Sequence, residues 1–139
     1  MKTSKKFLTY RGAVRPGEVN GHQQMKLQVY VDRYEQSGRQ FFALTGLTKA
    51  VLAELNAGVA VVEHDIKFQS PLFEDDLIHI ESNLVEFTDK VFTVYHEIKD
   101  SVTNEVKSTA NIKLLLFDLE KRKAISIPEV TRKKLKELL

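Results

Sequence analysis

The groups that could carry chemistry in this chain are oxygens and nitrogens, because the sequence of 139 residues contains no cysteine. A cysteine nucleophile, a disulfide framework and a zinc site with thiolate ligands are therefore excluded. No pair of histidines and carboxylates has the spacing of metal ligands, so we expect no metal site. The four histidines are His22, His64, His79 and His96. His22 lies in a polar loop beside Asn20 and is the histidine of greatest catalytic interest, whereas the other three fall in expected strands.

Hydrophobic periodicity predicts the elements that must position these groups. The predicted elements are a strand over Phe7–Val14, a long helix over Met25–Thr45, a short helix over Leu47–Asn56, strands over Val59–Gln69, Leu77–Phe87, Lys90–Lys99 and Glu105–Phe117, and a terminal helix over Pro128–Leu139. We expect Ser37 and Gly38, inside the long helix, to pack closely against a neighbour, because glycine there costs roughly 1 kcal/mol of helix propensity. The order indicates one α+β domain over residues 1–139, an antiparallel sheet wrapped around one long central helix.

Composition and charge exclude several classes of function. Lysine and arginine number 21 and aspartate and glutamate 19, a net charge of +2, which lacks the clustered positive charge of a dedicated nucleic-acid binder. No apolar run approaches the roughly 18 residues of a membrane span, so we expect no membrane insertion. The start, Met1–Lys6, is basic, but no apolar segment with a cleavage site follows. We therefore expect a cytoplasmic protein.

Two stretches of the chain carry a resemblance to a known family. The first combines residues 10–14 (YRGAV), 18–20 (EVN) and 30–35 (YVDRYE), and the second is residues 61–77 (VVEHDIKFQSPLFEDDL). Together with the element order, they resemble the hotdog-fold thioesterases of the 4-hydroxybenzoyl-CoA thioesterase and acyl-CoA thioesterase family. The resemblance implies hydrolysis of a thioester by water, with coenzyme A as part of the substrate and no separate cofactor. It also implies a homodimer or homotetramer formed by edge-to-edge sheet pairing, with the active sites at the seam.

The resemblance also implies positions for the catalytic groups. The family carries a carboxylate ten residues before the helix tyrosine, and this chain has Asn20 ten residues before Tyr30. An amide can orient water or donate to an oxyanion, but it is neither a base nor a nucleophile near neutral pH. Thioesterases of enediyne polyketide pathways resemble this chain in having Glu-x-Asn in the turn, which Glu18 and Asn20 match. They also have a helix arginine, and Arg39 of this chain lies one residue beyond the position where that arginine aligns.

A helix amino end offers free amides that can stabilise an oxyanion, and the family pattern assigns this role to the Leu27 amide. For orienting or activating the attacking water we rank Asn20 first, Glu18 second and Glu35 third. We expect the acyl pocket to lie between the long helix and a neighbouring subunit, lined by residues such as Met25, Leu27 and Phe68. The candidate substrate-binding residues are His22, Gln24, Tyr30, Tyr34, Arg39, His64 and Phe68.

Each candidate also has a simpler structural explanation. Asn20-Gly21 suits a turn that caps the helix, and Glu35 suits a solvated or interface-paired charge. Tyr30 and Tyr34 fall on the apolar stripe of the long helix and suit the core. His64 alternates with apolar residues and suits a buried imidazole. The basic runs within residues 120–123 and 132–134 suit either the phosphates of coenzyme A or a solvated surface.

Two functions therefore stay open at this stage. The first is hydrolysis of an acyl-CoA or acyl-carrier-protein thioester. The second is binding of acyl-CoA with weak or no catalysis, which Asn20 favours. A dehydratase of the same fold has no support, because the long helix carries no convincing pair of histidine and glutamate.

Overall fold

The computed structural model describes residues 4–139, so the first half of the basic start, residues 1–3, lies outside the described residues. The elements in chain order are β1 (Phe7–Ala13), a 3-10 turn η1 (Pro16–Glu18), α1 (Leu27–Leu44), α2 (Lys49–Leu55), β2 (Ala57–Phe68), β3 (Leu77–Phe87), β4 (Val91–Asp100), β5 (Val106–Asp118), β6 (Lys123–Ile125) and α3 (Glu129–Leu138).

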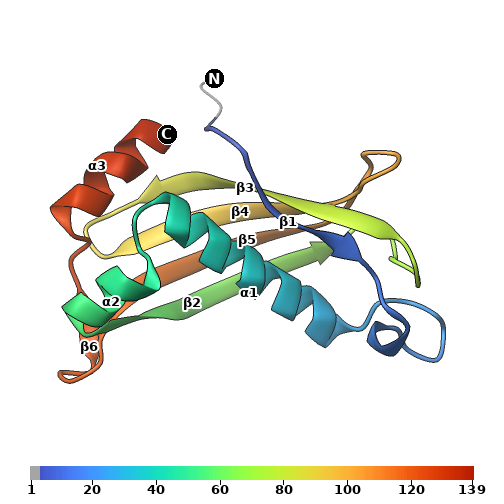
Figure 1. The fold of residues 1–139 in the computed structure, drawn as a ribbon, viewed down its shortest axis with the longest axis horizontal. Helices are drawn as coiled ribbons and strands as arrows, with labels where there is room; N and C mark the ends of the chain where they lie inside the picture. The colour runs from blue at the N-terminus through green and yellow to red at the C-terminus, as the bar shows by residue number, and fades with distance from the viewer. Residues whose placement is uncertain (1–3) are drawn as a thin grey trace.

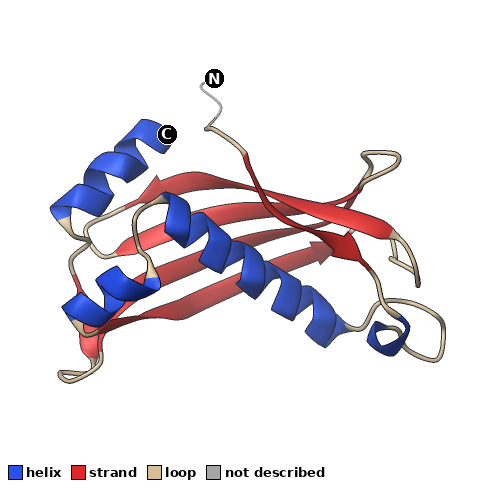
Figure 2. Cartoon of the chain, in the orientation of Figure 1, coloured by secondary structure: helices blue, strands red, loops and turns tan. Residues whose placement is uncertain are grey.

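The strands form one antiparallel sheet with the order β1-β3-β4-β5-β2, and β6 pairs with the end of β5. The long helix α1 lies across one face of this sheet, with α2 beside the start of β2 and α3 at the opposite edge of the molecule (Figures 1 and 2). The prediction of an α+β fold with one antiparallel sheet and one long helix is confirmed. The strands β1 and β2 form the two edges of the sheet.

The course of α1 follows from its apolar stripe. Its buried residues recur at helical spacing and are Tyr30, Arg33, Tyr34, Ser37, Gly38, Phe41 and Phe42. The four aromatic members of this stripe pack in one core with the inward side chains of the central strands, which include Ile80, Leu84, Val94 and Ile112. The helix ends before Gly46, whose φ of +86° is a left-handed conformation that glycine adopts at little cost. The path of α1 relative to the sheet is thereby fixed by burial rather than by side-chain caps, because the Lys26 side chain makes no capping hydrogen bond.

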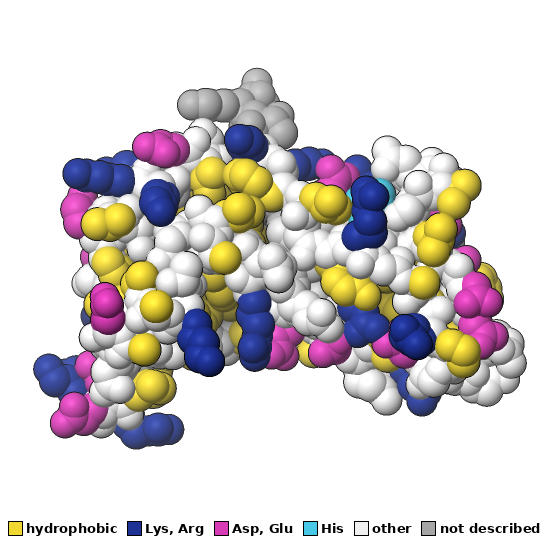
Figure 3. Space-filling view, viewed as in Figure 1, with side chains coloured by type: hydrophobic (Ala, Val, Ile, Leu, Met, Phe, Trp, Pro, Cys, Tyr) yellow, Lys and Arg dark blue, Asp and Glu magenta, His cyan; other side chains and the backbone are white. Residues whose placement is uncertain are grey.

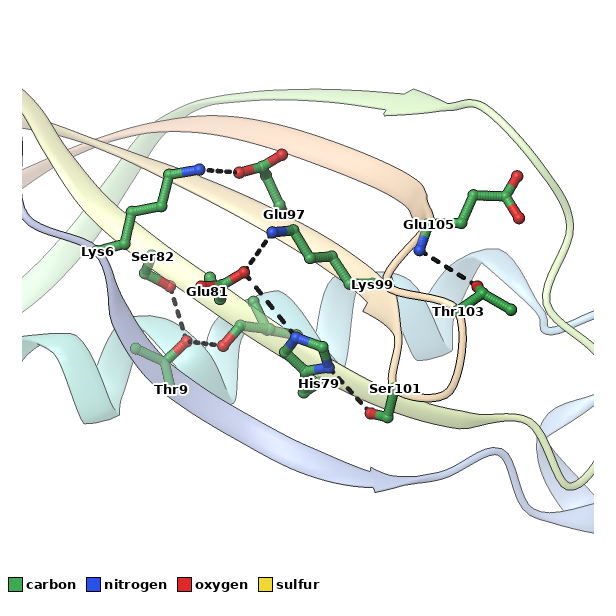
Figure 4. A network of polar contacts seen from close by, with 11 residues as sticks. Lys6, Thr9, His79, Glu81, Ser82, Glu97, Lys99, Ser101, Thr103 and Glu105 are labelled. Atoms are coloured by element: carbon green, nitrogen blue, oxygen red, sulfur yellow. Dashed lines mark hydrogen bonds and ion pairs between the residues drawn. The ribbon is translucent and has the colours of Figure 1, made fainter. Parts of the chain in front are cut away.

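The opposite face of the sheet carries a network of paired polar side chains (Figure 4). Lys6 donates to Glu97 at 2.7 Å, and Lys99 lies 2.5 Å from Glu81. The hydrogen bond from Lys99 lowers the pKa of the Glu81 carboxyl. The His79 ring contacts the Ser101 hydroxyl at 2.9 Å. Each of these side chains is paired with another, so none of them is a free catalytic group on the face turned away from α1.

Candidate functional site

A cavity of about 910 Å³ lies between the second half of α1, the short helix α2 and the edge strand β2. Much of its wall is apolar, and the wall includes Phe42, Leu47, Leu52, Val59, Ile112 and Leu114. Apolar side chains are also visible over α2 on this face of the molecule (Figure 3). An apolar cavity of this size, bordered by a few polar groups, is the usual form of a small-molecule site.

Five exposed charged or polar residues border the cavity: Glu35, Arg39, Thr48, Lys49 and His64. Glu35 and Arg39 lie one turn apart on α1 and form an ion pair at 2.9 Å, with both side chains mostly exposed. His64 borders the cavity from β2. Asn20, Glu18 and Glu35 are the residues expected to orient or activate the attacking water. Of these three, only Glu35 lines this cavity. Its ion pair is exposed and therefore weak, so the carboxylate is available to a ligand.

Beneath the cavity lie two buried side chains with polar atoms. The Tyr34 hydroxyl donates to Ser108 Oγ at 2.6 Å, and burial raises the pKa of Tyr34. His96, on β4, is 1% exposed and its ring lies 5.7 Å from that of Tyr34. Burial, with a smaller contribution from the nearby His64, lowers the pKa of His96 to about 3. His96 is therefore a neutral imidazole in the folded protein at neutral pH.

The buried His96 predicts a specific acid sensitivity. The imidazole has a pKa near 6.5 in the unfolded chain and about 3 in the folded one. Below about pH 6.5 His96 binds a proton in the unfolded chain but stays neutral in the folded protein. The free energy of unfolding therefore falls as the pH drops. Relative to a His96→Gln variant, the free energy of unfolding should fall about 1.4 kcal/mol more steeply per pH unit between pH 6 and 4. Urea unfolding across that range measures both slopes, and equal slopes would contradict the prediction.

The loop before α1 holds Asn20 in a structural role. Asn20 Oδ1 accepts hydrogen bonds from the amides of His22 and Gln24, at 2.8 and 3.2 Å. Backbone hydrogen bonds between Asn20 and Gln24 close the same turn. Residues 20–24 are exposed and do not line the cavity. Asn20 therefore organises this loop through its carbonyl oxygen, which leaves the Nδ2 amino group to face solvent or a partner.

The carboxylate of Glu18 is committed to two partners. It accepts a hydrogen bond from the Arg15 amide at 2.9 Å and forms a close ion pair with Arg33. Arg33 is 9% exposed, contacts Asp32 and lies 5.4 Å from the centre of the Tyr10 ring. Loss of the partner of a buried charge is strongly destabilising. Glu18 therefore anchors the loop to α1, which makes it a poor candidate for a base.

The amino end of α1 keeps the features of an anion site. Within residues 4–139, the amides of Leu27 and Gln28 donate to no other group, and the Leu27 side chain is 61% exposed. Beside this end, Tyr30 packs edge-on against Phe68 with ring centres 4.9 Å apart. Tyr30 is buried, which raises its pKa, whereas Phe68 is 53% exposed. Free amides at a helix start are suited to hold a developing negative charge.

Two expectations about the site are wrong, and a third stays a prediction. The third is an acyl pocket at a subunit boundary lined by Met25, Leu27 and Phe68; within the single chain Met25 is in the core, and the other two are exposed at the amino end of α1. His64 is exposed rather than buried, because β2 is an edge strand and the open cavity lies between His64 and α1. Gly38 does not pack against a neighbour, since a Cβ there would meet no atom within 4 Å. The missing side chain instead leaves space in the cavity wall.

The remaining candidates divide between the cavity and the surface. Tyr34 and Arg39 line the cavity, whereas His22, Gln24 and Tyr30 do not. Among the described residues, no cluster of three or more histidine, aspartate or glutamate side chains is arranged to hold a metal ion. None of the helices described is both long and apolar enough to cross a membrane. Of the two basic runs, the one within residues 120–123 is exposed and spans a turn and the first residue of β6, and in the other Arg132 is paired with Asp89 at 2.7 Å.

Comparison with known proteins places this arrangement in a family. No curated protein matches the chain. A Staphylococcus aureus protein solved in complex with CoA is similar at a TM-score of 0.88 and 14% identity, covering 99% of this chain and 87% of that one. A 1,4-dihydroxy-2-naphthoyl-CoA thioesterase from Synechocystis is similar at 0.83 and 14% identity, covering 96% and 98%. A gentisyl-coenzyme A thioesterase is similar at 0.80 and 20% identity, covering 91% and 98%.

These similarities show the fold and confirm the hotdog architecture predicted from the sequence. The sequence itself matches the family described as the thioesterase-like superfamily over residues 14–135. This match spans nearly the whole chain, and the chain therefore belongs to the thioesterase-like superfamily.

Proposed function

We propose that this protein hydrolyses acyl-CoA thioesters with water, in a dimer whose two active sites lie at the subunit seam. The observation that carries the proposal is the apolar cavity with Glu35 at its border, in a chain of the thioesterase-like superfamily. The similar structures named above include one in complex with CoA and two named as CoA thioesterases, which supports a CoA ester as substrate.

The need for a dimer follows from the edge strand β2. It is twelve residues long and, within the described chain, pairs with β5 on one side only. Its exposed apolar residues include Val61, Val62 and Phe68. A long apolar edge strand is an aggregation hazard unless another strand covers it. Antiparallel pairing of β2 with the β2 of a second copy would cover this edge and give a closed, two-fold symmetric assembly.

That pairing would also unite the two halves of the site. The helix α1 runs antiparallel to β2, so the amino end of α1 lies beside Phe68 and the cavity lies beside Val59 (Figure 1). A two-fold axis across β2 brings the Phe68 end of one strand against the Val59 end of the other. The free amides at Leu27 of one protomer would therefore face the cavity of its partner, and each site would use both chains.

The chemistry proposed for this composite site is a simple acyl transfer to water. The acyl group lies in the cavity, and Glu35 takes a proton from the attacking water. The water oxygen bonds to the carbonyl carbon while the Leu27 amide of the other protomer holds the developing oxyanion. The carbon–sulfur bond then breaks, and the departing thiolate takes the proton from Glu35. In this scheme Asn20 holds the loop before α1 in shape through its carbonyl oxygen.

The nucleotide end of the substrate needs basic residues near the cavity. The turn with Lys121, Arg122 and Lys123 follows Leu119, whose amide donates to the Asn56 carbonyl at the end of α2 at 3.0 Å. This turn therefore lies at the cavity end of the molecule, and we assign it the phosphates of coenzyme A. An acyl-carrier protein would offer a phosphopantetheine arm without that nucleotide. Neutralising the three basic residues should raise KM for acyl-CoA but not for an acyl-carrier-protein thioester.

The test of the proposed function is hydrolysis itself. Release of free thiol is measured with short, long and aromatic acyl-CoAs and with an acyl-carrier-protein thioester, while the oligomeric state is measured by sedimentation. Turnover of at least one acyl-CoA by a dimer or tetramer is the expected result. Failure to hydrolyse any of these thioesters would overturn the proposal and favour a protein that binds acyl-CoA without acting on it.

The substitution Asn20→Asp separates these two functions. An aspartate carboxylate accepts the same two amide hydrogen bonds as Asn20 Oδ1, so the loop should keep its structure. A carboxylate beside the oxyanion amides supplies a base that the asparagine lacks, and we expect kcat to rise about tenfold or more. Steady-state hydrolysis measures the change, with Asn104→Asp in an exposed turn as the control. A fall in kcat would show instead that the asparagine amino group is used in the reaction.

A further inference from the structure

Three side chains form a hydrogen-bonded row across the inner face of the sheet, ending at the cavity. His96 Nδ1, on β4, lies 2.6 Å from Ser82 Oγ on β3, its direct register partner. Ser82 Oγ lies 2.7 Å from Thr9 Oγ1 on β1, and Thr9 donates to the Ile80 carbonyl at 3.2 Å. Figure 4 shows Thr9 and Ser82 and the contact between their hydroxyl groups. A register irregularity between Leu8 and Tyr10 occurs at Thr9, and all three side chains are buried.

Only one arrangement of protons satisfies every contact in this row. The Thr9 hydroxyl has one proton, and the Ile80 carbonyl, which can only accept, requires it. Ser82 must then donate to Thr9, so its proton is no longer available to His96. The remaining contact is made only if His96 Nδ1 carries the proton and donates it to Ser82. The row therefore fixes the tautomer and leaves Nε2 as a bare acceptor.

This acceptor has no partner in the described chain and belongs to a ring that lines the cavity. No hydrogen bond to His96 Nε2 exists within residues 4–139, although the residue is 1% exposed. The Tyr34 hydroxyl, the nearest aromatic donor, is already bonded to Ser108. Within the described chain, the fully buried side-chain polar atom without a partner is Ser37 Oγ and not His96 Nε2, so Nε2 is open to the cavity. Its donor is therefore supplied from inside the cavity, by water or by a group of the ligand.

We infer that His96 recognises a hydroxyl group carried by the acyl part of the substrate, and so sets a preference for hydroxylated acyl thioesters. This inference rests on the proposed function, because it takes the cavity as the acyl site. The other polar side chains of the lining, such as Glu35 and His64, are exposed at its border, whereas His96 is buried. A buried acceptor among apolar side chains discriminates strongly between a chain with a hydroxyl and one without. His96 is a specificity residue and not the base, because a neutral imidazole with so depressed a pKa is a weak proton acceptor.

The test compares matched pairs of substrates that differ by one hydroxyl. The aliphatic pairs are octanoyl-CoA against its 3-hydroxy and 7-hydroxy derivatives, and the aromatic pairs are benzoyl-CoA against its monohydroxy derivatives. We expect the hydroxylated member of at least one pair to have a kcat/KM about 10- to 100-fold higher. Which pair shows the preference distinguishes an aliphatic from an aromatic acyl group. Equal values in all pairs would overturn the inference.

Variants tie the preference to this residue. His96→Phe removes the acceptor and should abolish the preference, whereas His79→Phe, on the opposite face of the sheet, should keep it. Ser82→Ala removes the partner of His96 Nδ1, so either ring nitrogen can then carry the proton, and the preference should fall. This variant replaces His96→Phe as the test if His96→Phe does not fold. A preference that survives both His96→Phe and Ser82→Ala would contradict the inference. The Nδ1-protonated tautomer is checked independently by two-bond and three-bond nitrogen–proton couplings of the ring.

A binding measurement separates this inference from the proposed function. Calorimetry with octanoate, the hydroxyoctanoates, benzoate and the hydroxybenzoates gives affinities whether or not any thioester is hydrolysed. If hydrolysis is absent but the hydroxylated acids bind more tightly through His96, the proposed function fails and the inference holds. If hydrolysis is present but hydroxylation changes neither kcat/KM nor affinity, the inference fails and the proposed function holds.

Discussion

A Glu35→Gln variant is expected to lose about 100-fold or more of kcat in acyl-CoA hydrolysis while it binds the substrate almost unchanged. Glu35 is the only carboxylate that lines the cavity within the described chain, and general base catalysis contributes about 10²- to 10⁴-fold. Glutamine keeps the size and the hydrogen-bonding reach of the side chain but cannot accept a proton from water. Steady-state kinetics measures kcat, and calorimetry with a thioether analogue of the substrate measures binding.

The control for this variant is Glu54→Gln on α2. Glu54 is exposed and lies outside the cavity lining, so its replacement should leave kcat unchanged. Loss of the exposed pair between Glu35 and Arg39 should change the free energy of unfolding by less than about 1 kcal/mol. A Glu35→Gln enzyme that retains wild-type kcat would exclude Glu35 as the base. Asn20 would then be the stronger candidate for action on the attacking water.

Replacing Val62 by glutamate is expected to convert the dimer to monomers and to reduce turnover below about one hundredth. Val62 lies in the middle of β2, is 57% exposed and does not line the cavity. In the proposed two-fold pairing, glutamates from both copies lie near one another at the seam, and burying like charges there is costly. Each monomer then keeps a cavity without the helix amides of a partner. Sedimentation velocity and the hydrolysis assay are run on the same sample.

The matched control is Leu8→Glu on β1, the opposite edge of the sheet. Leu8 is 56% exposed, so the two variants add the same charge at similar exposure on different edges. Leu8→Glu should remain dimeric and active. A Val62→Glu protein that stays dimeric, or a monomeric wild-type protein with full turnover, would show that β2 is not the seam of the active site.

Much of the fold could be predicted from the sequence, because each long element carries its own periodic pattern. Every predicted helix and strand exists, with ends that differ by at most two residues. The two elements that were not predicted, η1 and β6, have three residues each, which is too short for a periodic signal. The turn into β6 also uses Arg122 at a φ of +56°, and glycine or asparagine would have marked that turn more clearly.

The site was harder to predict, because it depends on which elements are neighbours. The alternation around His64 is real, but it cannot show that β2 is an edge strand with its side chains uncovered. The alternation of residues in β4 shows that His96 points to the same face of the sheet as Val94 and Ile98. The hydrogen-bonded row that fixes its tautomer depends on the register of three strands, which the sequence does not reveal. Likewise, Glu18 and Arg33 lie far apart in the sequence, and only the packing of α1 on the loop brings them into contact.

The absent side chain at Gly38 bears on how acyl preference can diverge in proteins of this shape. The helix backbone itself forms the wall there, and nothing stands within 4 Å of where a β-carbon would be. One codon change at that place would narrow the chamber, and it would also favour the helix, since alanine forms helices better than glycine by about 1 kcal/mol. Glycine at position 38 therefore keeps space in the cavity at the cost of helix stability. A related protein that acts on smaller acyl groups could regain that stability by the single substitution Gly38→Ala.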